Sequence, residues 1–560
     1  KDIMKTYVMK IQQHTHSDAA KLILYQNKAY EVIVQGEIYN AQSIYQLLKE
    51  AYPLQERLED IVFFAYQRWG EDAMLELEGA YSFVISSGKD VFAAKDPLGL
   101  SPLFYSKTND TIWLSNRIDA LLEASQQPRI LNSHGILELF SFGPSLSMDK
   151  TLFANVASLP MGSFLRIHNG DIKVKTYYKL PTIEHHDDME TTTLKVHDLL
   201  CHSIQQQMHH CKASFLSGGL DSSIITAVCA KEKEWHTYSL DYEGNAKNFK
   251  SNMYQVSMDN TFINQMLERY PCTHHWLMLK QQTLADTLEE SMLARNHPGM
   301  ADVDASLLWL CQQVAQKEAV ILSGECSDEI FGGYPWFYRD ELKDLPTFPW
   351  LRSTPQRIEL LKDDIKQLGY EAYIQQQYED SIRDIRYLDT DSEDDRRARR
   401  HTQLCLKWFM QTLVTRQVCE GDRANLTIRA PFANVALLEY VYNIPWQMKF
   451  YHGQEKGILR KAFANELPEE VCWRKKNPFP KTHNPQYADI VAKMLMERYK
   501  DSTSALHELL DDAHLKELIA TKGASFQLPW YGQLMSGPQL LAYLYQIDCW
   551  IRDYNIKIEK

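Results

Sequence analysis

The sequence contains no apolar run that approaches the roughly 18–20 residues needed to cross a bilayer. Its first residues, "KDIMKTYVMKIQQ", lack the apolar centre and the small-residue cleavage site of a signal peptide. An excess of basic residues is also missing, because the formal net charge is −13, whereas nucleic acids and anionic lipids require concentrated positive charge. The ten cysteines show no CxxC or zinc-ligand spacing, so we interpret them as reduced thiols. These absences predict a cytoplasmic protein with no membrane and no nucleic-acid partner.

The composition is that of a globular protein with several domains. Hydrophobic residues make up 44% and charged residues 24% of the 560 positions, values typical of chains that bury substantial cores. Length alone predicts about three or four domains, or fewer if some are large α/β units. A polar, acidic stretch, "PTIEHHDDMETTT", has the composition of a linker and separates two patterns of predicted elements.

The pattern of residues 1–180 is rich in short β-type runs. "YEVIVQGEIYN", "YSFVISS", "DVFAAKD" and "IWLSN" are punctuated by Gly, Asn and Asp, and helical segments such as "LEDIVFFAYQRWG" lie between them. We predict a layered α+β domain here. Residues 191–560 instead alternate helices with strands such as "ASFLS", "WHTYSLDY" and "AVILSGE". This alternation predicts a parallel, doubly wound α/β sheet with helical additions.

The segment "SFLSGGLDSS" (214–223) is the strongest local motif. We expect a strand that ends at Leu216, a turn, and a helix that opens with Asp221; the turn and the first helical residues are Ser217, Gly218, Gly219, Asp221, Ser222 and Ser223. Glycines allow close backbone approach, and a helix N-terminus presents unpaired N–H groups, so this turn suits a phosphate. It lacks the Lys and the spacing of a Walker A loop. The alternative is a capped strand-to-helix turn that binds nothing.

The carboxylate of Asp221 stands where phosphates would lie, which makes sense if a Mg²⁺ ion bridges the two. The whole string resembles the pyrophosphate loop of the N-type ATP pyrophosphatases. A second segment, "AVILSGECSDEIFGGYPWF" (319–337), has the same pattern of an apolar strand followed by a turn of small residues. Glu325, Asp328 and Glu329 come after this turn. We predict that Asp221 and Asp328 hold Mg²⁺ and that Glu325 orients or deprotonates an amine. Lys456, in "HGQEKGILRKAF", would neutralise charge in the transition state.

These motifs together resemble the asparagine synthetase family. The "SGGLDSS" loop, the "SGECSDEIFGGY" segment, "RAPF" (429–432) and the Lys before "ILR" occur in that family's order, and the resemblance runs from about residue 30 to the C-terminus. It implies that ATP activates a carboxylate as an acyl-adenylate, which an amine then attacks to give an amide. It also implies that strand ends hold AMP, at Leu216, Leu240, Ser323 and Gly324. Homodimers are common in the family, so a homodimer is an open possibility here.

The first domain resembles the family's glutaminase, an Ntn-type class-II amidotransferase, but departs from it. Its landmarks "QGEIYN" and "KDPLGLSPLFY" are present. The first residue is Lys1 rather than the nucleophilic Cys, and we expect that the family's start would lie before it. Gln35 replaces the Asn whose amide stabilises the oxyanion, and Leu58 replaces the Asp that pairs with the glutamine amine. We therefore predict inefficient glutamine hydrolysis, as in β-lactam synthetase-like relatives.

The synthetase pocket departs as well, in "TRQVCEGDRANLTIRAPF" (415–432). Val418 and Cys419 replace an Asp-Arg pair, and Glu420 and Asp422 replace methionines. If these side chains face the site, a cationic or amine-bearing substrate is favoured; if they face solvent, they carry no functional meaning.

The resulting hypothesis is an ATP- and Mg²⁺-dependent, AMP-forming, amide-bond-forming enzyme that acts on a small-molecule carboxylate and amine. One alternative is an ordinary glutamine-hydrolysing asparagine synthase that converts aspartate to asparagine. The other is a nucleotide-binding pseudoenzyme, against which the three charged groups of Asp221, Asp328 and Lys456 argue.

Overall fold

The computed structural model describes residues 6–11, 19–248, 259–476, 479–533 and 535–560. The chain divides into two compact units. The first contains residues 1–135, 146–181 and 557–559, and the second contains residues 136–145, 182–556 and 560. Among the described residues, no helix has the length and apolar character needed to traverse a bilayer.

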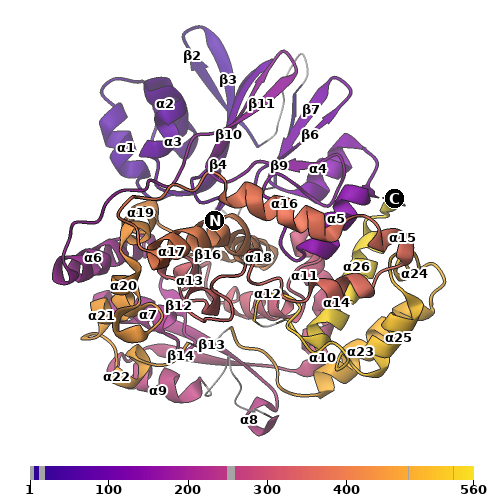
Figure 1. Cartoon of the computed structure of the whole chain (residues 1–560). Coiled ribbons are helices and arrows are strands. Elements are labelled where there is room, and N and C mark those ends of the chain that lie inside the picture. Colours follow the sequence, from indigo (N-terminus) through magenta and orange to yellow (C-terminus); the bar gives the residue numbers. More distant parts are fainter. Residues whose placement is uncertain (1–5, 12–18, 249–258, 477–478, 534) are drawn as a thin grey trace. The chain divides into compact units, whose positions relative to one another are not determined.

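The first unit is built on two antiparallel sheets, drawn in indigo and purple in Figure 1. The larger has the order β11-β10-β5-β4-β3-β2, with strands Asp171–Thr176, Ser163–His168, Asp90–Lys95, Gly79–Ser87, Lys28–Ile38 and Lys21–Tyr25. The smaller has the order β1-β7-β6-β9, with strands Val8–Ile11, Thr111–Ser115, Phe104–Thr108 and Ala157–Ser158. A short parallel pair joins β8 (Ile130–Asn132) to β17 (Lys557–Glu559).

The layers of the first unit follow from the alternation of side chains along its strands. In β4, Phe83 and Ile85 pack into a cluster with residues of α1 (Ala41–Leu48), α2 (Leu58–Trp69) and α3 (Ala73–Glu76). The intervening Val84 packs into a second cluster with β1 and β7 residues such as Met9 and Leu114. Because successive side chains of a strand point to opposite faces, the large sheet lies between a helical layer and the small sheet. The prediction of a layered α+β fold is confirmed.

The second unit contains a five-stranded, fully parallel sheet. Its order is β14-β13-β12-β15-β16, with strands Thr273–Leu279, His236–Tyr242, Ala213–Phe215, Val320–Leu322 and Thr427–Arg429. The predicted alternation of strand and helix is confirmed. From β12 the chain first extends the sheet in one direction through β13 and β14, and then returns to add β15 and β16 on the other side. The strand order therefore reverses between β12 and β15, the position at which α/β sheets bind ligands beyond their carboxyl ends.

Helices cover the sheet and supply its core. Buried residues of α12 (Asp302–Val314), including Leu307, Leu308 and Cys311, pack with Ala213 and Ile321 of the central strands. α7 (Leu220–Glu232) follows β12, and α18 (Met410–Arg423) leads into β16. The C-terminal part is helical, as predicted, and α26 (Gly537–Asp553) is almost entirely buried.

Two predicted boundaries shift by a few residues. β12 ends at Phe215 rather than Leu216. The predicted linker is shorter than its composition suggested, because α6 (Met189–Gln207) begins within it. The Asp188 carboxylate accepts a hydrogen bond from the Thr191 N–H at 2.8 Å. This acidic residue, which we assigned to the linker, is therefore the N-cap of the helix.

Candidate active site

The turn after β12 is closed by its own serines. The Ser217 N–H donates to Ser222 Oγ at 3.1 Å, and the two hydroxyl oxygens also lie 3.1 Å apart. Gly218 has a φ of +70°, and a Cβ there would lie 2.9 Å from the Asp259 carbonyl oxygen. Only glycine adopts this backbone without strain. The turn ends at Gly219, which is the N-cap of α7, so the N–H groups of the first helical turn open into the site.

The turn after β15 approaches the first one closely. The Ser323 N–H donates to the Arg429 carbonyl oxygen of β16 at 2.8 Å, and Gly324 follows. A Cβ at Gly324 would lie 2.9 Å from the Cβ of Asp221, so glycine is required for this contact. The Ser327 hydroxyl, at the start of α13 (Ser327–Phe331), donates to Asp221 Oδ1 at 2.7 Å. The two motifs are therefore joined at adjacent strand ends, as predicted.

Lys456 lies between the two predicted metal-binding carboxylates. It is the N-cap of α21 (Gly457–Phe463), with a φ of +56°. Its Nζ is 2.7 Å from Asp221 Oδ2 and 2.6 Å from Asp328 Oδ1. Burial opposes the charge of Lys456, but Asp221 and Asp328 outweigh it and raise the pKa of the ammonium. The ammonium of Lys456 thus lies between the two carboxylates that the sequence analysis assigned to Mg²⁺.

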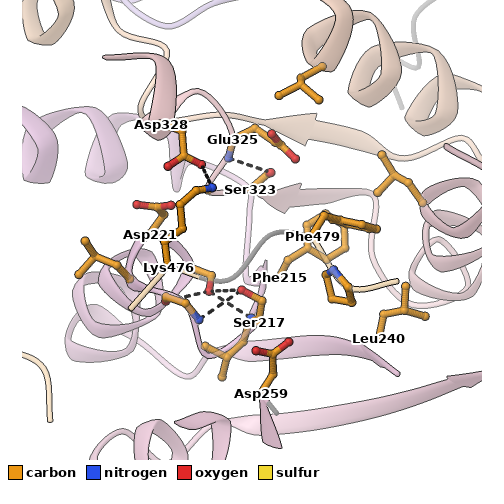
Figure 2. A pocket seen from close by; sticks show the side chains of 18 of the residues that line it. Phe215, Ser217, Asp221, Leu240, Asp259, Ser323, Glu325, Asp328, Lys476 and Phe479 are labelled. Carbon is orange, nitrogen blue, oxygen red and sulfur yellow. Dashed lines mark hydrogen bonds and ion pairs between the residues drawn. The ribbon is translucent and has the colours of Figure 1, made fainter. Parts of the chain in front are cut away.

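Asp328 also pairs with a second lysine that the sequence analysis did not single out. Lys476 Nζ donates to Asp328 Oδ2 at 2.8 Å and lies 4.9 Å from the centre of the Tyr334 ring. Burial alone would raise the pKa of Asp328, but Lys456 and Lys476 lower it to about 2. Figure 2 shows Asp221, Asp328 and Lys476 gathered at one end of the site. The carboxylate is therefore ionised at any physiological pH.

Glu325 pairs with an arginine, whereas Asp221 and Asp328 pair with lysines. Arg416 Nη1 donates to Glu325 Oε1 at 3.2 Å, and its Nε lies 3.4 Å from Asp304 Oδ1. The guanidinium also stacks over the Phe479 ring, at 4.3 Å from the ring centre. Burial raises the pKa of Glu325, and Arg416 opposes the effect. A carboxylate poised in this way can take up a proton from an amine.

These groups line one cavity of about 230 Å³. Its charged end holds Asp221, Glu325, Asp328, Lys456 and Lys476. Its other end is apolar and includes Phe215, Leu240, Val303, Leu307 and Ile428, three of them from strands of the sheet or their ends. Phe215 and Leu240 lie away from the charged end in Figure 2. A nucleotide has the same division, with a flat base at one end and phosphates at the other.

Most of the predicted site residues line this cavity. They are Leu216, Ser217, Gly219, Asp221, Ser222, Leu240, Ser323, Gly324, Glu325, Asp328 and Lys456. Gly218 and Ser223 are not among the lining residues. Gly218 shapes the turn through its backbone, and the Ser223 side chain is fully buried.

Arg474 and Lys476 were missed as site residues by the sequence analysis. Arg474 Nη1 donates to the Gly218 carbonyl oxygen at 2.9 Å, its Nη2 pairs with Asp259, and its guanidinium stacks on Phe262 at 3.9 Å. Arg474 thus lines the cavity and holds the turn through the Gly218 carbonyl. The available signal was the basic run "WRKK" at 473–476, since such a run beside an anion site supplies phosphate-binding charge.

The four substituted positions in α18 do not line the cavity. Val418, Cys419, Glu420 and Asp422 are absent from its lining, whereas Leu413, Arg416 and Gln417 of the same helix are present. Glu420 is fully buried, and its Oε1 accepts a hydrogen bond from Ser291 Oγ in α11 (Leu288–Arg295) at 2.7 Å. Burial raises the pKa of Glu420 well above its ordinary value. The inference of a cationic substrate from these residues is therefore not supported.

The first unit contains the two residues on which the prediction about glutamine rests. Gln35 is buried in β3, opposite Ser82. Leu58 begins α2 and packs against the apolar cluster of the helical layer. Asp60, two residues later, accepts a hydrogen bond from the Gln55 N–H at 2.8 Å and pairs with Arg57. Its carboxylate is thus engaged by two residues that precede α2.

Comparison with known proteins assigns the family. The model of the "Asparagine synthase" family matches residues 195–552, and that of the "Glutamine amidotransferase domain" matches residues 13–178. "Asparagine synthetase [glutamine-hydrolyzing] 3" of Bacillus subtilis (strain 168) is 38% identical over 96% of this chain and 89% of its own length. "Asparagine synthetase [glutamine-hydrolyzing] 1" of the same organism is 26% identical over 81% of this chain and 76% of its own. The human "Asparagine synthetase [glutamine-hydrolyzing]" is 21% identical over 79% of this chain and 70% of its own. The chain thus belongs to the asparagine synthetase family and is an ATP-dependent, amide-forming ligase.

Proposed function

We propose that the cavity between β12 and β15 binds ATP and activates a carboxylate substrate as an acyl-adenylate, with release of pyrophosphate. The observation that carries this proposal is the position of Lys456, whose ammonium lies within 3 Å of both Asp221 and Asp328 at the point where the strand order reverses. The β12 turn would bind the pyrophosphate through backbone N–H groups and serine hydroxyls, and the apolar end would take the base.

The donor set also fits a magnesium ion. Mg²⁺ in nucleotide sites is held by one or two carboxylates together with phosphate oxygens, and Asp221 and Asp328 offer that pair. When bound, Mg²⁺ would neutralise phosphate charge. Among the described residues no group of three or more His, Cys, Asp and Glu could form a self-sufficient metal site, so the ligand set proposed here includes the nucleotide.

The remaining charged groups have different roles in the two half-reactions, which are formation of the acyl-adenylate and attack by the amine. Lys456 and Lys476 would stabilise the charge that develops on the departing pyrophosphate and on the acyl oxygen. Glu325 would accept the proton that the attacking amine loses when the amide bond forms and AMP departs. Arg416 would position Glu325 through their 3.2 Å contact and keep it ionised.

Exchange of labelled pyrophosphate into ATP separates these steps. We expect carboxylate-dependent exchange in the wild-type protein, at least about a hundredfold less in Asp328→Asn, and an unchanged rate in Asp286→Asn, an exposed residue of α10 (Gln281–Asp286). Glu325→Gln should retain exchange but lose amide formation. ATP binding without exchange under any mixture of carboxylates and amines would contradict the proposal.

We further propose that the first unit hydrolyses glutamine inefficiently and that the amine comes from another source. The support is the apolar side chain of Leu58, together with the engagement of Asp60 by Arg57 and Gln55. The competing candidate is glutamine-dependent conversion of aspartate to asparagine, which the names of the relatives favour.

Ammonia release from glutamine by the full-length protein decides between these candidates. Under our proposal wild-type protein releases ammonia slowly, and free ammonia or another amine supports amide formation. Rapid ammonia release coupled to asparagine formation would establish the competing candidate.

A further inference from the structure

A second cavity lies in the second unit and shares no lining residue with the nucleotide cavity. It has a volume of about 170 Å³. It is bordered by the loop before α17 (Glu393–Leu404), by α17 itself, by the end of α19 (Val435–Asn443) and by α20 (Trp446–Lys449). These helices carry their labels in Figure 1. The polar lining residues include His185, Asp391, Asp395, Arg399, Tyr442 and Lys449.

Lys449 is the unusual member of this lining. Only 2% of the residue is exposed, yet no hydrogen bond or ion pair joins its ammonium to any residue that the structure describes. Transfer of an unpaired ammonium into a protein interior costs several kcal/mol. A lysine kept in such a position calls for an acceptor that enters from the cavity.

The two acids whose charges act on Lys449, Asp391 and Asp395, are not that acceptor. Asp391 receives two hydrogen bonds from Arg399, at 2.9 and 3.1 Å, and one from the Leu388 N–H at 2.9 Å. Asp395 receives the Trp446 N–H at 2.6 Å and the Ser392 hydroxyl at 2.6 Å. Both carboxylates thus serve the local backbone and Arg399, which leaves the Lys449 ammonium facing the cavity.

A second unsatisfied group belongs to another residue that lines the same cavity. The Tyr442 hydroxyl is buried and has no hydrogen-bond partner among the described residues, although Arg399 stacks over its ring at 5.0 Å. One ammonium and one hydroxyl with no acceptor match the two oxygens of a carboxylate. Asp391, Asp395 and Glu184 also line the cavity, so a dianion would be repelled, whereas an adjoining ammonium would be attracted.

We propose that this cavity binds a small molecule with a single carboxylate, in particular an α-amino acid, through Lys449 and Tyr442. Its volume suits a ligand of that size, and Leu388, Ala398, Ile444 and Pro445 offer apolar surface to a short side chain. The site is separate from the proposed nucleotide site, and its occupancy can be measured without any turnover.

The test is footprinting of lysines in the intact wild-type chain with a limiting amine-acylating reagent. Burial, with a further contribution from Arg399, lowers the pKa of Lys449 to about 7 against the opposing effect of Asp391 and Asp395, so the amine is reactive near neutral pH. Glycine, asparagine and acetate should each reduce acylation of Lys449, by about tenfold at saturation. Methylamine should leave it unchanged, and Lys493, exposed on α23 (Gln486–Lys500), should be acylated equally in every sample.

Variants give a second measurement. Calorimetric titration with glycine should show binding to wild-type protein and to Lys493→Met, and at least about tenfold weaker binding to Lys449→Met. Absence of protection at Lys449 by glycine, asparagine and acetate would overturn the site. Protection by inorganic phosphate but by no carboxylate would overturn the assigned ligand class. Undiminished glycine binding by a folded Lys449→Met variant would overturn the role of the lysine.

Discussion

Replacement of Lys456 by Met tests the cation between the two carboxylates. Its Nζ is 2.7 Å from Asp221 Oδ2 and 2.6 Å from Asp328 Oδ1, so the acids lie within about 5 Å of each other. At that distance and an effective dielectric constant of about 20, the repulsion left by removal of the ammonium is about 3 kcal/mol. For a domain of this size that loss lowers the unfolding temperature by about 4 °C.

The same variant should respond more strongly to magnesium. With the ammonium removed, the two carboxylates are open to a divalent cation. Mg²⁺ at ten times its dissociation constant would raise the free energy of unfolding by about 1.4 kcal/mol. Thermal unfolding with and without Mg²⁺, in the absence of nucleotide, should therefore show a larger shift for Lys456→Met than for wild type. Pyrophosphate release should fall at least about a hundredfold.

The control is Lys493→Met, because Lys493 is exposed on α23 and its loss should change neither measurement. The reasoning would be refuted if Lys456→Met unfolded at the wild-type temperature and Mg²⁺ shifted both proteins equally.

Three further changes have predicted outcomes. Burial, with the charge of Asp328, raises the pKa of Glu329 to about 8. The contribution of the neutral Glu329 carboxyl to the free energy of unfolding is therefore complete below about pH 4 and is lost as the pH rises through 8. Glu329→Gln keeps an acceptor for the Tyr334 hydroxyl and should raise stability by a few kcal/mol near pH 9 but not near pH 5, measured by urea unfolding. Arg474→Met frees the Gly218 carbonyl and should raise the KM for ATP about tenfold. An unchanged KM would show that the turn keeps its conformation without Arg474. Gly324→Ala pushes a methyl group against Asp221 and should abolish nucleotide binding in a calorimetric titration, with wild-type far-ultraviolet circular dichroism.

The alternation of apolar residues in strands such as β4 was enough to predict the layers of the first unit, because Phe83 and Val84 must face opposite sides of the sheet. The two glycine turns were predictable for a similar local reason. Each follows a short apolar strand directly, and neighbouring parallel strands bring their carboxyl ends to the same edge. Asp221, Glu325 and Asp328 could therefore be expected to line one site.

Contacts that depend on the rotation of a helix or the path of a loop could not be predicted in this way. The sequence of α18 does not reveal that Arg416 faces the cavity while Glu420 turns to Ser291, because both positions are buried and charged. Lys476 reaches Asp328 from a loop with no periodicity. The isolation of Lys449 depends on hydrogen bonds from α17, its N-cap Ser392 and the start of α20 that engage the neighbouring carboxylates.

The pairing of β12 with β15 has a consequence for how the protein folds. Ser214 pairs with Leu322, and the Asp221–Lys456 contact spans 235 residues of chain. Contacts of such long sequence separation form slowly, since the closure entropy of the intervening chain must be lost first. The cavity between β12 and β15 consequently has no precursor in any local segment, and it exists only once the sheet is complete. Nucleotide binding should therefore appear in the last kinetic phase of refolding, and a bound nucleotide should slow unfolding rather than speed the early steps of folding.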